Sequence, residues 1–180
     1  MLQIHISSVE LWDELNEQFI TTKSQLLTLE HSLVSLSKWE SKWCKPFLTK
    51  SEKTHEELID YVRCMTITQN VDPTVYEYLS AENMRMINDY INSPMTATKF
   101  PVDENRKINR ETMTSEKIYY SMIALNIPFE CQKWHLNRLI ALIRVCNDKN
   151  KPSKKKNMKE IMSRNAALNA ARRKQLNTKG

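Results

Sequence analysis

The stretch TSEKIYYSMIALNIPFECQKWHLNRLIALIRVCN, residues 114–147, carries the strongest helical pattern in the chain. Its apolar residues recur every three or four positions, which is typical of amphipathic helices. We expect a first helix capped by Thr114 or Ser115 and ended by Pro128, and a second helix over about 129–146. The first apolar face comprises Ile118, Tyr119, Met122, Ile123 and Leu125. The second comprises Trp134, Leu136, Leu139, Ile140, Leu142, Ile143, Val145 and Cys146, a surface wide enough to predict a central helix.

The N-terminal third shows shorter patterns. Alternating apolar and polar residues predict strands over 2–6 and near 25–30. Between them, residues 11–20 fit a short helix or irregular structure. A helix is expected near 32–44, ending before Pro46.

Helix-start signals follow along the middle of the chain. A capping box at Thr54 opens one helix, and Asp72 before a proline caps a short one. Ser80 caps a third helix, which ends before Pro94. A short strand is expected over 95–100, a connecting loop over 101–112, and a further helix over 158–176.

Glycine is almost absent, since Gly180 is the only one. Phosphate-binding loops, dinucleotide fingerprints and nucleophile elbows all need glycine where the backbone turns sharply or approaches a ligand. These motifs are therefore excluded. Extensive antiparallel sheet is not expected either, because tight hairpin turns favour glycine.

The four cysteines show no C-x-x-C spacing, and the N-terminus lacks a secretory-signal pattern. No apolar run reaches the roughly 18 residues that a membrane span needs. We expect an intracellular protein with reduced, mostly buried thiols and no membrane partner.

Candidate catalytic and metal-binding residues are sparse. Cys131 and His135 stand four apart on an expected helix, but no second ligand pair accompanies them, so a buried thiol and a surface imidazole are favoured over zinc. No paired carboxylates or activated nucleophile stand out. We predict a non-enzymatic protein without cofactors or metals. Trp39 and Trp43, with lysines around them, fit either a nucleobase-stacking platform or an aromatic core, and we favour the core.

Charge divides the chain in two. Residues 149–180 hold eleven Lys or Arg residues and one acid, Glu160, a net +10. The whole chain carries +6, so residues 1–148 carry −4. Such a basic tail suits an acidic partner, either nucleic acid or protein, and its alanines favour a helix on docking; the alternative is a disordered extension that only solubilises the chain. The candidate contacts are Lys154, Lys155, Lys156, Lys159, Arg164, Arg172, Arg173 and Lys174.

The predicted fold is mainly α, in the α+β class. Residues 1–148 form a helical domain with one or two short N-terminal strands, and residues 149–180 form a basic, helical C-terminal extension.

Several segments resemble a family of small proteins encoded by tailed bacteriophages and prophages. The resemblance covers nearly the whole chain and rests on residues 29–33, 37–40, 45–48, 94–98, 113–139 and 164–176. It implies a place in the tail-gene module and the role of a tail assembly chaperone, which coats the tape measure protein and recruits tail tube subunits. No catalytic residues are implied. The implied location is the host cell cytoplasm during virion morphogenesis.

Two other functions stay open at the level of sequence. One is a structural virion protein, for example at the head–tail junction, which would place the chain in the virion. The other is a nucleic-acid-binding protein that uses its basic tail. Self-association is compatible with each of them. Lys155, Lys156 and Asn157 also match a slippery codon run, at which a frameshift would give a longer product.

Overall fold

The computed structural model describes residues 1–8, 10–13, 18–21, 23–49, 51–100, 112–150 and 158–177. The chain forms two compact units, Met1–Asn147 and Asp148–Gly180, which we describe one at a time. The fold is mainly helical with short N-terminal strands, as predicted. The elements are β1 (Leu2–Ile6), β2 (Glu10–Asp13), β3 (Gln18–Thr21), β4 (Gln25–Leu29), α1 (Leu33–Trp43), α2 (His55–Met65), η1 (Pro73–Tyr78), α3 (Ala81–Asn92), α4 (Ser115–Ala124), η2 (Phe129–Lys133), α5 (Leu136–Asn150) and α6 (Met158–Leu176).

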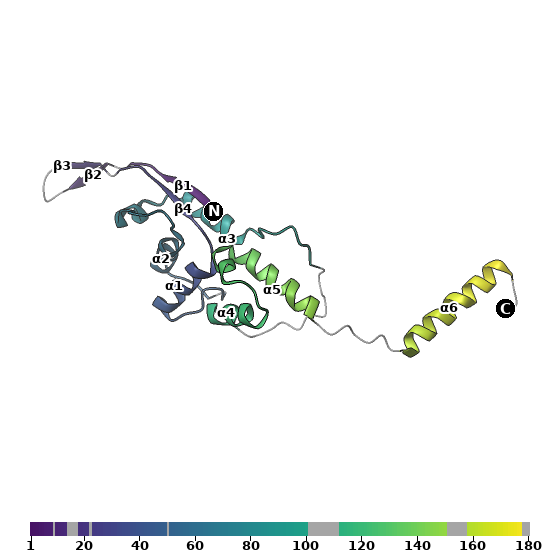
Figure 1. The fold of residues 1–180 in the computed structure, drawn as a ribbon. Helices are drawn as coiled ribbons and strands as arrows, with labels where there is room; N and C mark the ends of the chain where they lie inside the picture. Colours follow the sequence, from purple (N-terminus) through teal and green to yellow (C-terminus); the bar gives the residue numbers. More distant parts are fainter. Residues whose placement is uncertain are drawn as a thin grey trace. The chain divides into compact units, whose positions relative to one another are not determined.

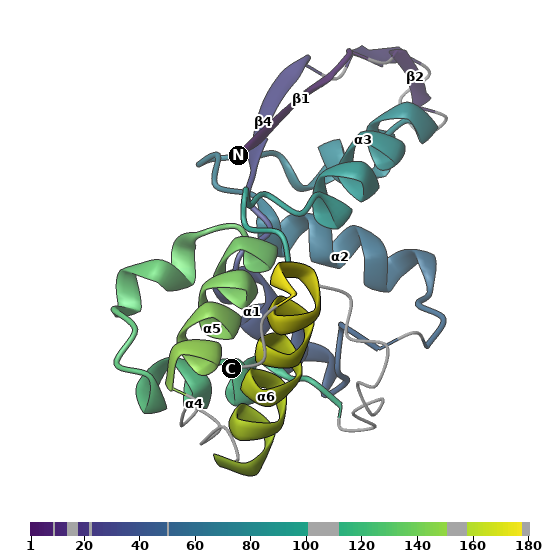
Figure 2. The ribbon, with the colours of Figure 1, turned by 90° about the vertical axis from the view of Figure 1, so that its right-hand side faces the viewer.

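The strands form two antiparallel pairs. β1 pairs with β4, from Leu2 opposite Leu29 to Ile6 opposite Gln25, and β2 pairs with β3. Alternate residues of β1 and β4 are buried, as the period of two predicts. Figure 1 shows the β1–β4 ribbon leading from the helices of this unit toward β2 and β3, and Figure 2 shows β1 and β4 side by side from another direction.

The outer edge of β4 is closed by the segment after α2. Ile67 N–H donates to the Thr28 carbonyl at 2.8 Å, and Glu30 N–H donates to the Met65 carbonyl at 2.9 Å. The Thr68 hydroxyl accepts the Thr28 N–H at 2.8 Å. Because unpaired strand edges invite association with other chains, these bonds protect β4.

The core lies where β1, β4 and the helices meet. α1 packs against α2, α4 and η2. Each fully buried apolar side chain contributes about 1.5–3 kcal/mol relative to an exposed one. The largest fully buried side chains are Trp39, Tyr61, Ile4, Leu27, Leu29, Leu33, Leu36, Met65, Ile87, Ile118, Met122 and Leu136.

The predicted helix starts are confirmed at three positions. Thr54 forms a complete capping box with Glu57, and the side chains of Asp72 and Ser80 accept backbone N–H groups at the starts of η1 and α3. Ser32 adds a capping box with Ser35 at the start of α1. Each cap stabilises its helix by about 1 kcal/mol.

The second helix of the 114–147 stretch begins later than predicted. Residues 129–133 form the 3₁₀ helix η2, Trp134 is extended, and α5 starts at Leu136. The reason is tertiary: His135 forms a β-bridge with Ser32, and Leu136 N–H donates to the His31 carbonyl at 2.7 Å. The prediction of a central helix holds as far as Cys146, because residues 139–146 are buried or half-buried against the core, and only the last four residues of α5 are exposed.

Three other expectations are wrong. Residues 10–13 and 18–21 form strands, whereas a short helix or irregular structure was expected; the four residues between them lie outside the described ones. Residues 95–100 form no strand. Among the thiols, all of which are free, only Cys131 is buried and Cys44 is exposed. Of the expected loop over 101–112, residues 101–111 lie outside the described part of the chain.

In the described part of the chain, no left-handed position is occupied by glycine. The residues with positive φ there are Cys44, Asn70, Met95, Asn126 and Asn177. Asparagine tolerates this conformation better than most residues, and it takes three of the five positions.

The second unit contains α6, a helix predicted from the sequence. Its described side chains, residues 162–177, are all exposed. Apolar and charged residues do not separate onto two faces of this helix. None of the helices in the described part of the chain is long and apolar enough to cross a membrane.

Candidate functional site

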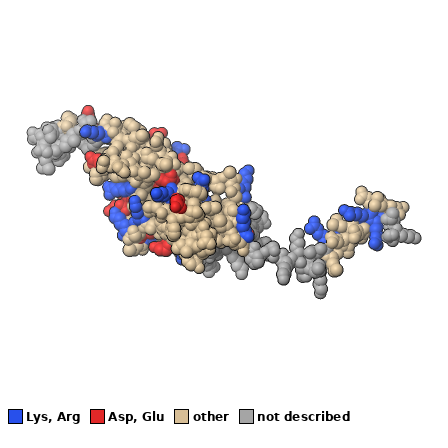
Figure 3. All heavy atoms as spheres, in the orientation of Figure 1, with Lys and Arg blue, Asp and Glu red and all other residues tan. Residues whose placement is uncertain are grey.

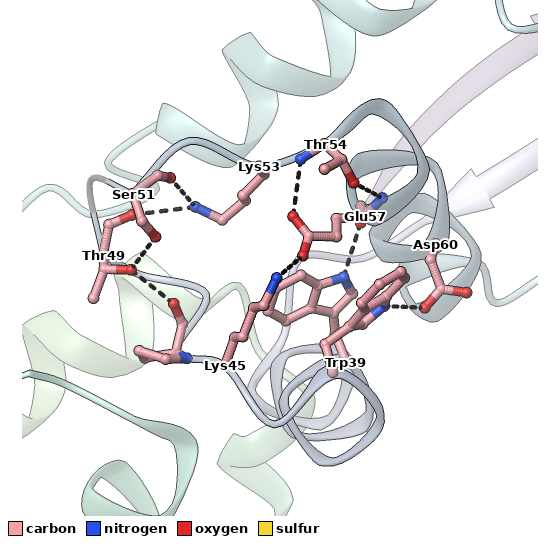
Figure 4. A network of polar contacts seen from close by, with 10 residues as sticks. Trp39, Lys45, Thr49, Ser51, Lys53, Thr54, Glu57 and Asp60 are labelled. Carbon is pink, nitrogen blue, oxygen red and sulfur yellow. Dashed lines mark hydrogen bonds and ion pairs between the residues drawn. The ribbon is translucent and has the colours of Figure 1, made fainter.

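The two tryptophans of α1, Trp39 and Trp43, take part in a set of polar contacts that join α1 to α2. Trp39 Nε1–H donates to the Glu57 carbonyl and Trp43 Nε1–H to the Asp60 carboxylate, both at 2.8 Å. Lys45 pairs with the Glu57 carboxylate at 2.5 Å. Figure 4 shows Lys45 and Thr54 converging on this carboxylate. The hydrogen bond from Lys45, together with that from the Thr54 N–H, lowers the pKa of Glu57.

These contacts decide between the two functions considered for the tryptophans, an aromatic core and a nucleobase-stacking platform. Trp39 is only 1% exposed, so it belongs to the core, as favoured from the sequence. Its ring stacks on Trp43 at a centroid distance of 6.1 Å. The pair joins two helices and does not form an open stacking platform.

Cys131 and His135 do not share a helix, contrary to the spacing argument. Cys131 lies in η2, and His135 lies before the first turn of α5. His135 Nε2–H donates to the Tyr90 carbonyl at 3.0 Å, and its Nδ1 accepts the Asn137 N–H at 3.3 Å. The described residues contain no group of three or more His, Cys, Asp or Glu that could hold a metal ion.

A second histidine completes a buried polar cluster. His31 and His135 are 1% and 5% exposed, with ring centroids 5.1 Å apart. His31 Nδ1 forms a 2.6 Å hydrogen bond with the Tyr61 hydroxyl. Burial, reinforced by the neighbouring His135, lowers the pKa of His31 to about 3. Burial also lowers the pKa of His135. Both rings are therefore neutral at pH 7, and the cluster joins helices without a charge.

The start of α4 is held by a carboxylate from α1. Buried Glu40 accepts the Ser115 N–H at 2.7 Å and the Phe47 N–H at 3.0 Å. A negative charge at a helix N-terminus is favourable, because the first N–H groups of a helix lack partners within it. Thr114, the predicted cap, makes no side-chain capping bond.

The end of α4 turns the chain sharply into η2. Asn126 is left-handed, and Ile127 N–H donates to the Met122 carbonyl at 2.8 Å, the bond pattern of a Schellman motif. The Tyr119 hydroxyl then donates to the Gln132 side chain at 2.9 Å. These bonds fix α4 and η2 to each other.

The outward side of this fixed pair carries large apolar side chains. Tyr120 is 72% exposed, Ile123 60% and Phe129 54%. Tyr120 and Ile123 stand three apart and so share one face of α4. We call these three residues the α4–η2 surface.

The sequence did not reveal this surface. Ile123 was expected on the buried face with Ile118 and Met122, which the structure does bury. The spacing of these residues could have revealed it. Ile118 and Met122 are four apart and define the inner face of the helix, and at about 100° per residue Tyr120 and Ile123 fall on the opposite face.

The predicted cationic contacts all belong to the second unit. Arg164, Arg172, Arg173 and Lys174 are exposed on α6. Lys159 lies in the first turn of α6, and Lys154, Lys155 and Lys156 lie outside the described residues. Figure 3 shows blue side chains and no red ones on the described part of α6 in this view.

Comparisons with known proteins add no relative. Neither a protein-family model, nor a curated protein, nor a solved structure matches this chain significantly.

Proposed function

We propose that this chain is a non-enzymatic bacteriophage tail assembly chaperone, whose α4–η2 surface holds a helical segment of the tape measure protein. It acts in the host cell cytoplasm and delivers that protein to tail tube subunits. The observation that carries the proposal is the exposure of Tyr120, Ile123 and Phe129. All three lie within residues 113–139, the longest segment that resembles the phage tail proteins.

The chemistry of the surface suits a helical partner. Amphipathic helices dock through apolar anchors, and tyrosine supplies a large contact area with a polar tip. The hydrogen bonds around α4 and η2 fix the backbone that carries these side chains before binding, which reduces the backbone entropy lost on association. Isolated apolar residues on a surface are ordinary, but a pair on one face of a helix, followed by a third at the start of the next helix, is a candidate interface.

Coexpression with the tape measure protein of the same phage tests this proposal. We expect the wild-type chain to copurify with it and the double variant Tyr120→Ser, Ile123→Ser to lose most of this binding. The variant should remain folded, since exposed substitutions usually change stability by no more than about 0.5 kcal/mol.

The matched control is Leu26→Ser, Ile67→Ser, because each of these side chains is 51% exposed outside the α4–η2 surface. This control should bind like wild type. Absence of copurification with both partners soluble, or equal losses in the two variants, would count against the proposal.

The composition of purified virions separates a chaperone from a virion component. A chaperone should be scarce in particles, whereas a head–tail junction protein should be present in stoichiometric amount. A stoichiometric result by mass spectrometry would replace the chaperone with the structural alternative.

A further inference from the structure

The second unit has a concentration of positive charge that the chaperone proposal does not use. Asp148–Gly180 contains eleven Lys or Arg residues and two acids, a net +9. Four of these cations, Arg164, Arg172, Arg173 and Lys174, are exposed on the helix α6. A helical polycation of this kind attracts a polyanion.

The four cations are distributed around the helix. Successive residues of an α-helix are rotated by about 100°, so Arg164 and Arg173, nine positions apart, point in directions about 180° apart. Arg172 and Lys174 point about 160° apart by the same geometry. No single face of α6 therefore holds the charge.

This distribution favours a partner with negative charge on two sides. A helix that lies on a flat acidic protein surface presents one face to it, and its remaining cations stay in solvent. The major groove of duplex DNA has a row of phosphates along each wall. It is about 12 Å wide, close to the roughly 10–12 Å diameter of a helix with its side chains. The deep, narrow major groove of an RNA duplex does not admit a helix in this way.

We propose that α6 binds duplex DNA by lying in the major groove, with its arginines and Lys174 on the phosphates of both walls. The contacts are to phosphates and do not depend on base sequence. The inference is independent of the tape measure proposal, because it concerns a different unit of the chain.

A salt series with the full chain and a random-sequence DNA duplex of about 20 base pairs tests this inference by fluorescence anisotropy. Affinity should fall steeply as salt rises from about 50 to 200 mM, because each phosphate contact contributes about 0.9 to the slope of log affinity against log salt. The quadruple variant Arg164→Gln, Arg172→Gln, Arg173→Gln, Lys174→Gln should lower this slope by about 3.6.

A second quadruple variant distinguishes a binding site on α6 from a general effect of the chain's net charge. Lys38, Arg85, Lys99 and Lys133 are exposed on the first unit. Their replacement by Gln removes the same charge and should leave the slope within about 1 of wild type, that is, within one phosphate contact. Equal effects of the two variants would overturn the proposal.

The role of the helix needs a variant that keeps every charge. Ala167→Pro interrupts α6 and should weaken duplex binding by about tenfold or more, whereas Ala167→Ser should not. Poly-glutamate of similar charge and a single-stranded oligonucleotide should both bind more weakly than the duplex. Equal or tighter binding of poly-glutamate would assign α6 to acidic proteins. Unchanged duplex binding by Ala167→Pro would show that the segment acts as a flexible polycation and not as a helix. Either this result or the poly-glutamate result would contradict the proposal.

Discussion

At the residue scale, the most consequential groups are two imidazoles in the core. Each ring has one hydrogen bond that defines its role: His31 joins Tyr61, and His135 joins the Tyr90 carbonyl. His135 Nδ1 also accepts the Asn137 N–H, so a proton on that nitrogen would replace an attraction with a repulsion. Both sites are therefore built for the neutral form.

These histidines make the fold sensitive to acid. The pKa of His31 is about 3 in the folded chain against 6.5 for an ordinary histidine, so the folded state binds fewer protons than the unfolded state. Its contribution to stability is complete above about pH 6.5 and is lost as pH falls toward 3, by about 1.4 kcal/mol per pH unit. Urea unfolding at pH 7, 6 and 5 should show this decline.

Two variants check the source of the decline. His31→Gln should reduce the pH dependence between about 6.5 and 5, where ordinary carboxylates are still ionised. His55→Gln should not, because His55 is exposed. A wild-type stability that is constant over this range, or an unchanged dependence in His31→Gln, would show that His31 is not held neutral by burial.

At the element scale, α1 and α4 end with a left-handed residue other than glycine, the residue most common at such a position. α1 ends at Trp43 and is capped by Cys44, which has φ 51° and ψ 33° and whose N–H donates to the Glu40 carbonyl at 2.8 Å. A residue with a Cβ pays about 1–2 kcal/mol in this conformation. Asn126 fills the corresponding position after α4 with less strain, because asparagine tolerates it.

Cys44→Gly should therefore stabilise the fold. The relief of strain exceeds the cost of about 0.5–1 kcal/mol for a more flexible unfolded chain, so a gain of about 0.5–1 kcal/mol is expected. Chemical denaturation measures it, with Cys44→Ala as the control that keeps a Cβ. If the two variants were equally stable, the left-handed conformation of Cys44 would not measurably lower the free energy of unfolding.

The helix starts could be predicted because they are local. The capping bonds at Thr54, Asp72 and Ser80 join residues two or three positions apart, and the sequence displays such pairs directly. The start of α5 could not be predicted, because the bridge that delays it joins His135 to Ser32 from a distant segment. Similarly, the cap of α4 comes from Glu40, which lies 75 residues away from Ser115.

At the scale of the whole molecule, the chain combines an apolar surface on one unit with a basic helix on the other. The charge division and the helix over 158–176 follow from composition alone, so the sequence predicted them. The α4–η2 surface required the structure, because an apolar residue such as Ile123 looks the same in sequence whether it faces the core or solvent. The large apolar residues on that surface are what a protein partner would recognise.

The most direct measurement is photo-crosslinking during phage assembly. Tyr120→p-benzoylphenylalanine places a reactive ketone on the α4–η2 surface, and the same replacement at Leu26 gives a control site of 51% exposure. We expect position 120 to crosslink to the tape measure protein and position 26 not to. Crosslinks from position 120 only to other virion proteins, or equal yields from both positions, would contradict the chaperone function proposed for this surface.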